Sequence, residues 1–289
     1  MIIGRERHLR TPGPTPIPES VQKAMGQPII GHRSSEFSEL LIDTSQRLRS
    51  IFGTTQDVII LTGSGTAALE AAVANITQPG ENVAVLITGA FGERFAEICE
   101  EYKLNVHRME VEWGISCQPD TLRSFIKSLP PLSAVFMTHC ETSTGVLNPI
   151  MELAQVIREH SDAFIVVDAV SSAVGVPINM DKWGLDIVVT GSQKALMCPP
   201  GLAFLAASPR AWKKVHLHQR KTFYLNLSTY QNSLEKGMSP YTPAISLIYG
   251  LKESLSLIEK EGLENVQNRH LTLKNMTRAA VLAAGLSLF

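Results

Sequence analysis

A lysine and an aspartate near the ends of two apolar runs are the residues of this chain best suited to chemistry. Asp168 closes the run Phe164-Ile-Val-Val-Asp, and Lys194 follows the apolar run 186–189 in the stretch Gly-Ser-Gln-Lys. If both runs are buried strands, the two side chains can hold an aromatic cofactor between them. Pyridoxal phosphate needs such a pair, because the amine bonds to its aldehyde and the carboxylate keeps its ring nitrogen protonated. A lysine in a turn rich in glycine and serine is also compatible with a solvated surface residue.

A glycine-rich turn at residues 62–66, with the sequence TGSGT, follows another apolar run and opens a helical pattern. The glycines, including Gly65, let the backbone approach an anion, which free N–H groups at a helix start stabilise. Ser64 and Thr66 add hydroxyl donors. The spacing fits neither the P-loop nor the complete dinucleotide fingerprint. The segment therefore predicts a phosphate-binding turn, with a plain strand-to-helix turn as the alternative.

Two more apolar runs end in residues that could touch a flat ligand. Phe91 in TGAFGER (88–94) could stack on an aromatic ring, or could be an ordinary core residue. The segment HCETSTG (139–145) offers Glu141, Thr142 and Ser143, which could equally serve as turn and capping residues. In a doubly wound sheet the carboxyl ends of the strands form the edge where ligands bind. Five strand ends with these side chains together predict a pyridoxal phosphate site.

The elements that must position these residues are short apolar runs that alternate with helical patterns. Continuous apolar strands between helices indicate a sheet buried on both faces, so we expect an α/β fold with a mostly parallel sheet and helices on both faces. The prolines of residues 11–18 exclude a helix or a central strand there. The patterns predict strands at 58–61, 82–87, 134–137, 164–167, 186–189 and 202–205, and helices at 34–52, 66–76, 92–102, 151–159, 245–260 and 263–284.

The chain length of 289 residues allows one large domain or somewhat more. We expect an N-terminal arm at 1–18, a large cofactor-binding domain at 19–262, and a linking helix with the start of a truncated C-terminal domain at 263–289. Gly285 should end the last helix, and residues 286–289 should begin a strand. Such a strand would lack a partner in this chain, so we expect a C-terminal small domain to be largely missing.

The net charge and the lengths of the apolar runs indicate small molecules, rather than nucleic acid or membrane, as the binding partners. A net charge of −1 gives no electrostatic reason to expect nucleic acid or an anionic membrane surface. No apolar run approaches the roughly 18 residues of a membrane span. The charged residues at positions 5–8 are unlike a signal peptide, so we expect a cytoplasmic protein. The four cysteines show no CxxC spacing and no cluster with histidine, which indicates reduced thiols and no metal site.

With these motifs in view, the chain resembles the class V (fold type I) aminotransferases of the alanine–glyoxylate, serine–pyruvate and ureidoglycine–glyoxylate group. The resemblance covers essentially the whole chain. It implies the fold type I large domain, pyridoxal 5'-phosphate, and transfer of an amino group from alanine or serine to a 2-oxo acid such as glyoxylate or pyruvate. It rests on TPGPT (11–15), GSGTAALE (63–70), GAFGER (89–94), ETSTGV (141–146), VDAVSS (167–172), GSQKAL (191–196) and PPG (199–201).

The resemblance also implies roles for individual residues. Lys194 would bond to the cofactor, Asp168 would pair with its ring nitrogen, and Phe91 would stack on the ring where the family often has tryptophan. The family forms two-fold dimers in which the neighbouring subunit completes the phosphate site, and Tyr241 and Thr242 match that segment. The remaining cofactor contacts would come from Ser64, Gly65, Thr66 and Gln193 at the phosphate, Thr142 at the ring hydroxyl, and Val170 on the opposite ring face.

One departure from the family leaves alternatives open. The family's C-terminal domain carries an arginine that clamps the substrate carboxylate, and we expect this arginine to be absent here. A truncated cofactor-binding form with little or no turnover is therefore one alternative. An aminoethylphosphonate transaminase is another. A cysteine desulfurase-like lyase is the third, although that chemistry uses a histidine where this chain has Phe91.

Overall fold

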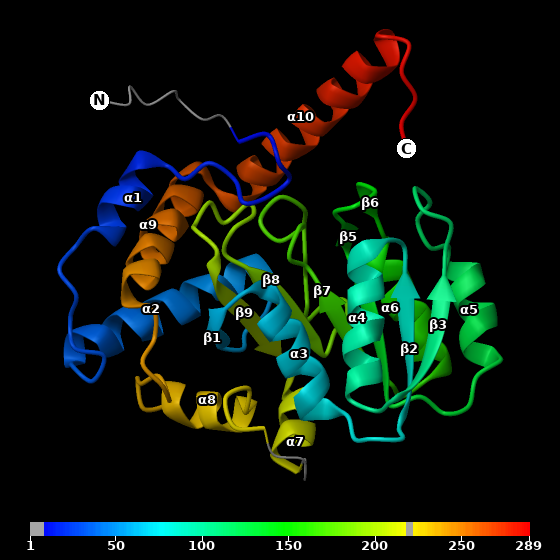
Figure 1. The fold of residues 1–289 in the computed structure, drawn as a ribbon, viewed down its shortest axis with the longest axis horizontal. Coiled ribbons are helices and arrows are strands. Elements are labelled where there is room, and N and C mark those ends of the chain that lie inside the picture. Colours follow the sequence, from blue (N-terminus) through cyan, green and yellow to red (C-terminus); the bar gives the residue numbers. More distant parts are fainter. Residues whose placement is uncertain (1–8, 218–221) are drawn as a thin grey trace.

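A seven-stranded sheet forms the centre of the molecule, with the strand order β1-β9-β8-β7-β4-β2-β3 (Figure 1). Only β9 runs antiparallel to its neighbours, β1 and β8, and the other pairs are parallel. The mostly parallel sheet expected from the sequence is therefore confirmed. The strands are β1 (Val58–Gly63), β2 (Asn82–Ile87), β3 (Asn105–Glu110), β4 (Ala134–Thr138), β7 (Phe164–Asp168), β8 (Ile187–Gly191) and β9 (Gly201–Ala207).

The computed structural model describes residues 9–217 and 222–289. The first eight residues of the expected arm, and the signal-peptide argument based on them, lie outside the described residues. None of the described helices is long and apolar enough to span a membrane.

Helices cover both faces of the sheet, because successive strand side chains point to opposite sides. In β7, for example, Val166 enters one apolar core and Val167 the other. One face carries α1 (Glu19–Met25), α2 (Ser35–Phe52), α5 (Pro119–Lys127), α6 (Ile150–His160) and α9 (Ile245–Glu261). The other carries α3 (Gly65–Ile76), α4 (Ala90–Glu101), α7 (Pro209–Leu217) and α8 (Leu227–Leu234).

Helix α10 (Leu263–Ala283) follows α9 and projects from the body of the molecule, with only Val266 buried (Figure 1). Gly285 ends it with a φ of 76°, as expected of a glycine after a helix. The expected strand at 286–289 is wrong: these residues have no regular structure. Within residues 9–217 and 222–289 they pair with no strand, and Phe289 lies against Gly114.

Candidate active site

The predicted site residues converge at one edge of the sheet. Strands β1, β2, β4, β7 and β8 run in the same direction, so their carboxyl ends meet there. The structure brings together the ends that carry the glycine-rich turn, Phe91, the 139–145 segment, Asp168 and Lys194. A small hairpin of β5 (Cys140–Glu141) and β6 (Val146–Leu147) extends from the end of β4.

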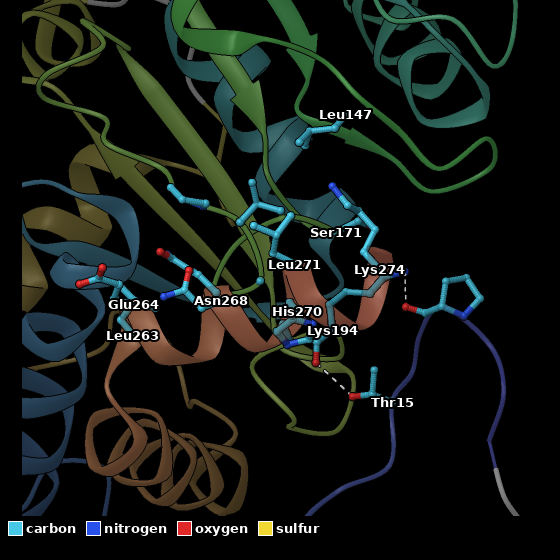
Figure 2. Close-up of a pocket in the computed structure, with 16 residues that line it drawn as sticks. Thr15, Leu147, Ser171, Lys194, Leu263, Glu264, Asn268, His270, Leu271 and Lys274 are labelled. Carbon is cyan, nitrogen blue, oxygen red and sulfur yellow. Dashed lines mark hydrogen bonds between the residues drawn. The ribbon is translucent and has the colours of Figure 1, made fainter. Parts of the chain in front are cut away.

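Lys194 is not a solvated surface residue, since its relative exposure is 8%. Its Nζ donates a hydrogen bond to the carbonyl of Pro12 at 3.2 Å (Figure 2). Burial lowers the pKa of this amine, while the nearby Cys140 and Asp168 act in the opposite direction. A partly desolvated amine of this kind is more readily neutral, which is the form that attacks an aldehyde.

Asp168 ends β7 with a relative exposure of 2%. Its Oδ1 accepts a hydrogen bond from the N–H of Val170 at 2.8 Å. Burial raises the pKa of this carboxyl to about 6. Within the described ranges 9–217 and 222–289, Asp168 takes part in no ion pair. Arg94 and Lys194 act in the opposite direction on this pKa but form no ion pair with the carboxylate. Such a buried carboxylate suits a ligand that brings a positive charge, such as a protonated ring nitrogen.

The first turn of α3 is arranged for an anion. Ser64 is its N-cap residue, yet no side chain caps the helix and no acidic residue lies in its first turn. Gly65 packs so closely on Val170 that an added Cβ would come within 2.9 Å of Val170 Cγ2. Free N–H groups beside a close backbone approach fit a phosphate, whose charge also interacts well with the helix dipole. Thr66 follows in the same turn, half-buried.

The polar residues after β4 make two kinds of contact: two of them cap helix α4, and the third bonds to a residue after β7. Glu141, fully buried, accepts hydrogen bonds from the N–H groups of Phe91 and Gly92, each at 3.1 Å. Ser143 Oγ accepts from the Ala90 N–H at 3.0 Å. The capping interpretation is therefore correct for Glu141 and Ser143. Thr142 instead shares a hydroxyl–hydroxyl hydrogen bond with Ser171, which follows β7.

Phe91 is half-buried and not a core residue. The guanidinium of Arg94 lies 4.7 Å from the centre of its ring. Gln193, also half-buried, lies against Gly191, where an added Cβ would come within 2.7 Å of its Oε1. Both side chains are thus at the site edge and accessible to a ligand.

Tyr241 is held by its own chain beside the end of β1. Its hydroxyl donates to the Phe223 carbonyl at 2.7 Å, and its ring stacks on Tyr224 with centroids 5.1 Å apart. Tyr224 in turn donates to the carbonyl of Thr62 at 2.9 Å. Thr242 is exposed.

The residue patterns of the sequence did not indicate that the N-terminal arm and α10 take part in the site. A cavity of about 950 Å³ lies beside Lys194, between the arm and α10 (Figure 2). Such a volume suits a small-molecule ligand. The proline-rich segment 11–18 was the only signal for the arm, and it excluded regular structure without indicating a position. The lining includes Pro12, Thr15, Ser171, Lys194, His270 and Lys274.

Comparison with known proteins agrees with this geometry. The model of the family described as aminotransferase class-V matches residues 9–287. An uncharacterized aminotransferase of Methanocaldococcus jannaschii is 44% identical over 97% of this chain and 73% of its own. The L-aspartate–glyoxylate aminotransferase of Paracoccus denitrificans is 36% identical over 96% of this chain and 71% of its own. The solved alanine–glyoxylate aminotransferase of Nostoc sp. superposes with a TM-score of 0.94 at 32% identity, covering 100% of this chain and 77% of that one. The chain belongs to the class V aminotransferase family.

Proposed function

We propose that this aminotransferase binds pyridoxal 5'-phosphate at the sheet edge and moves an amino group from a small amino acid, of the alanine or serine type, to glyoxylate or pyruvate. One observation carries the proposal: a buried carboxylate, Asp168, ends β7, and a buried amine, Lys194, follows the adjacent strand β8. The names of the Paracoccus and Nostoc relatives support glyoxylate as the acceptor.

The residues present fit the cofactor. Asp168 would pair with the ring nitrogen, Phe91 and Val170 would contact the two ring faces, and Thr142 would reach the ring hydroxyl. The cofactor supplies a cationic ring that accepts the electron pair released at the substrate's α-carbon. The phosphate would be held by the first turn of α3 and by one side chain after β8, that is by Ser64, Gly65, Thr66 and Gln193.

The chain's own chemistry centres on one amine and one carboxylate. Lys194 Nζ acts as the general base that takes the α-proton of the substrate and as the acid that returns it. Burial lowers the pKa of Lys194 and so favours the neutral base at working pH. Asp168 stays ionised when it faces a cationic nitrogen, since a nearby positive charge offsets the desolvation that raises its pKa.

The proposal extends to a two-fold dimer in the cytoplasm. Because the Tyr241 hydroxyl is engaged within its own chain, the exposed Thr242 is the more available of the two for a partner's phosphate site. The four cysteines are free, as thiols are in a reducing compartment.

The test begins with the purified chain and added pyridoxal phosphate. We expect an absorbance band that borohydride fixes onto Lys194, located by peptide mapping, and loss of the band in Lys194→Ala. Lys182→Ala is the matched control, because Lys182 is exposed. Fixation at another lysine would refute the cofactor site.

Amino transfer is then measured with alanine or serine as donor and glyoxylate as acceptor. A fixed adduct without transfer would show a cofactor-binding form with little turnover. Aminoethylphosphonate as the better donor, or release of sulfide from cysteine, would identify the corresponding enzyme of the same fold instead.

A further inference from the structure

The N-terminal arm is fastened to the backbone that carries Lys194. The N–H of Thr15 donates to the carbonyl of Gln193 at 3.1 Å, and the Thr15 hydroxyl donates to the carbonyl of Lys194 at 3.0 Å. The Lys194 amine returns a hydrogen bond to the Pro12 carbonyl at 3.2 Å (Figure 2). The residue that must react is thus bonded to the arm at both its backbone and its amine.

Gly13, between these contacts, lies directly on the lysine side chain. An added Cβ would come within 2.5 Å of Lys194 Cδ, 2.8 Å of Cε and 2.9 Å of Nζ. These atoms are the far end of a flexible side chain, so the lysine is the first to be displaced by an alanine. The φ of 158° at Gly13 adds backbone strain to this substitution, which the Thr15 variants do not carry. The adjacent cavity of about 950 Å³ gives the displaced amine somewhere to go.

We propose that Gly13 and Thr15 are positioning residues for Lys194: the arm holds its amine at one place on the cavity wall, and Gly13 is required because a side chain there would push the amine away. The inference rests on the proposed role of Lys194. Its physical basis is that a reacting group held in place avoids the search over rotamers that a free lysine makes.

The test compares Gly13→Ala with Gly31→Ala, the same change where an added Cβ meets nothing within 4 Å. In the cofactor-free protein, reductive methylation with formaldehyde is followed against pH, with the exposed Lys182 as internal reference. We expect Gly13→Ala to raise methylation of Lys194 relative to Lys182 on the order of tenfold, and to raise the pH midpoint of Lys194 methylation, because the amine enters solvent. Gly31→Ala should match the wild type.

The second measurement is the rate at which added pyridoxal phosphate becomes fixed to Lys194. We expect Gly13→Ala to slow it about tenfold to a hundredfold, since misplacing a reacting group by about 1 Å has effects of this size. Thr15→Val should act in the same direction, and Thr15→Ser, which keeps the hydroxyl, should restore the wild-type rate. If Gly13→Ala fails to fold, the comparison of Thr15→Val with Thr15→Ser tests the inference instead.

Equal methylation ratios and fixation rates in Gly13→Ala and Gly31→Ala, or no difference between Thr15→Val and Thr15→Ser, would overturn the inference. If wild-type Lys194 takes up no cofactor at all, the proposed function fails, and the methylation ratio of the cofactor-free protein still decides whether the arm positions the amine.

Discussion

Replacement of Asp168 by asparagine should make the cofactor-free protein more stable at neutral pH. The amide keeps the shape of the side chain and can still accept the hydrogen bond from the Val170 N–H, but carries no charge. Burial raises the pKa of Asp168 from 3.8 to about 6. That rise corresponds to a cost of about 3 kcal/mol for the ionised form in the folded state.

The direction in which stability changes with pH follows from proton binding. Between pH 3.8 and about 6 the folded state holds a proton on Asp168 that the unfolded state has released, so stability falls as pH rises through this window. Asparagine does not titrate. The free-energy difference between Asp168→Asn and wild type should therefore grow by about 2 kcal/mol from pH 4 to pH 7.5.

Urea denaturation of both cofactor-free proteins at the two pH values measures this difference, and the effects of groups that do not interact with Asp168 cancel between them. Asp162→Asn, at an exposed carboxylate, is the control and should show little change. Bound cofactor should reverse the order at pH 7.5, because a protonated ring nitrogen pairs only with the aspartate. A stability difference that stays constant across the pH range would refute the claim that burial disfavours the ionised form of Asp168 in the cofactor-free protein.

Two further predictions concern the phosphate turn and a buried histidine. Gly65→Ala should weaken binding of pyridoxal phosphate by on the order of tenfold or more, because its Cβ would come within 2.9 Å of Val170 Cγ2 and shift the turn. A binding titration compares this variant with Gly31→Ala, and equal affinities of the two would contradict the prediction. Burial lowers the pKa of His139 to about 4, so the unfolded state binds a proton first as pH falls below 6.5. His139→Gln should therefore gain about 3 kcal/mol relative to wild type between pH 7.5 and pH 4 in urea denaturation, and a constant difference would show that the histidine is not desolvated.

The central strands could be predicted because they are buried on both faces and so are apolar throughout. The run 82–87 matches β2 at both ends. β3 was missed because it lies at the sheet edge and is only partly covered. Arg108 within it forms ion pairs with Glu93, Glu100 and Glu110, so its outer face is charged and gives no apolar run. An edge strand of this composition has no signal that distinguishes it from a loop.

The convergence of the site residues before position 200 was also predictable, since each lies at or within a few residues of a strand end and parallel strands end at one edge. The position of the arm was not. The contact between the Thr15 N–H and the Gln193 carbonyl joins backbone atoms about which side-chain identity says nothing. The proline-rich pattern limits the backbone of the arm, but its partner is set only by the finished fold.

The different contacts of Glu141, Ser143 and Thr142 could have been inferred from helix α4. This helix begins after Gly89, which has no side chain to cap it. The N–H groups of its first turn therefore need an acceptor from another element, and a carboxylate is the best partner for them. Glu141 supplies it to Phe91 and Gly92, and Gly89 makes the room, since an added Cβ would come within 2.5 Å of Glu141 Cγ. Ser143 lies in the turn after Glu141 and donates its N–H and hydroxyl to Glu141 Oε1 at 3.1 and 2.7 Å, so it joins Glu141 at the helix. Thr142 between them faces the Asp168 side of the edge, where its hydroxyl meets Ser171.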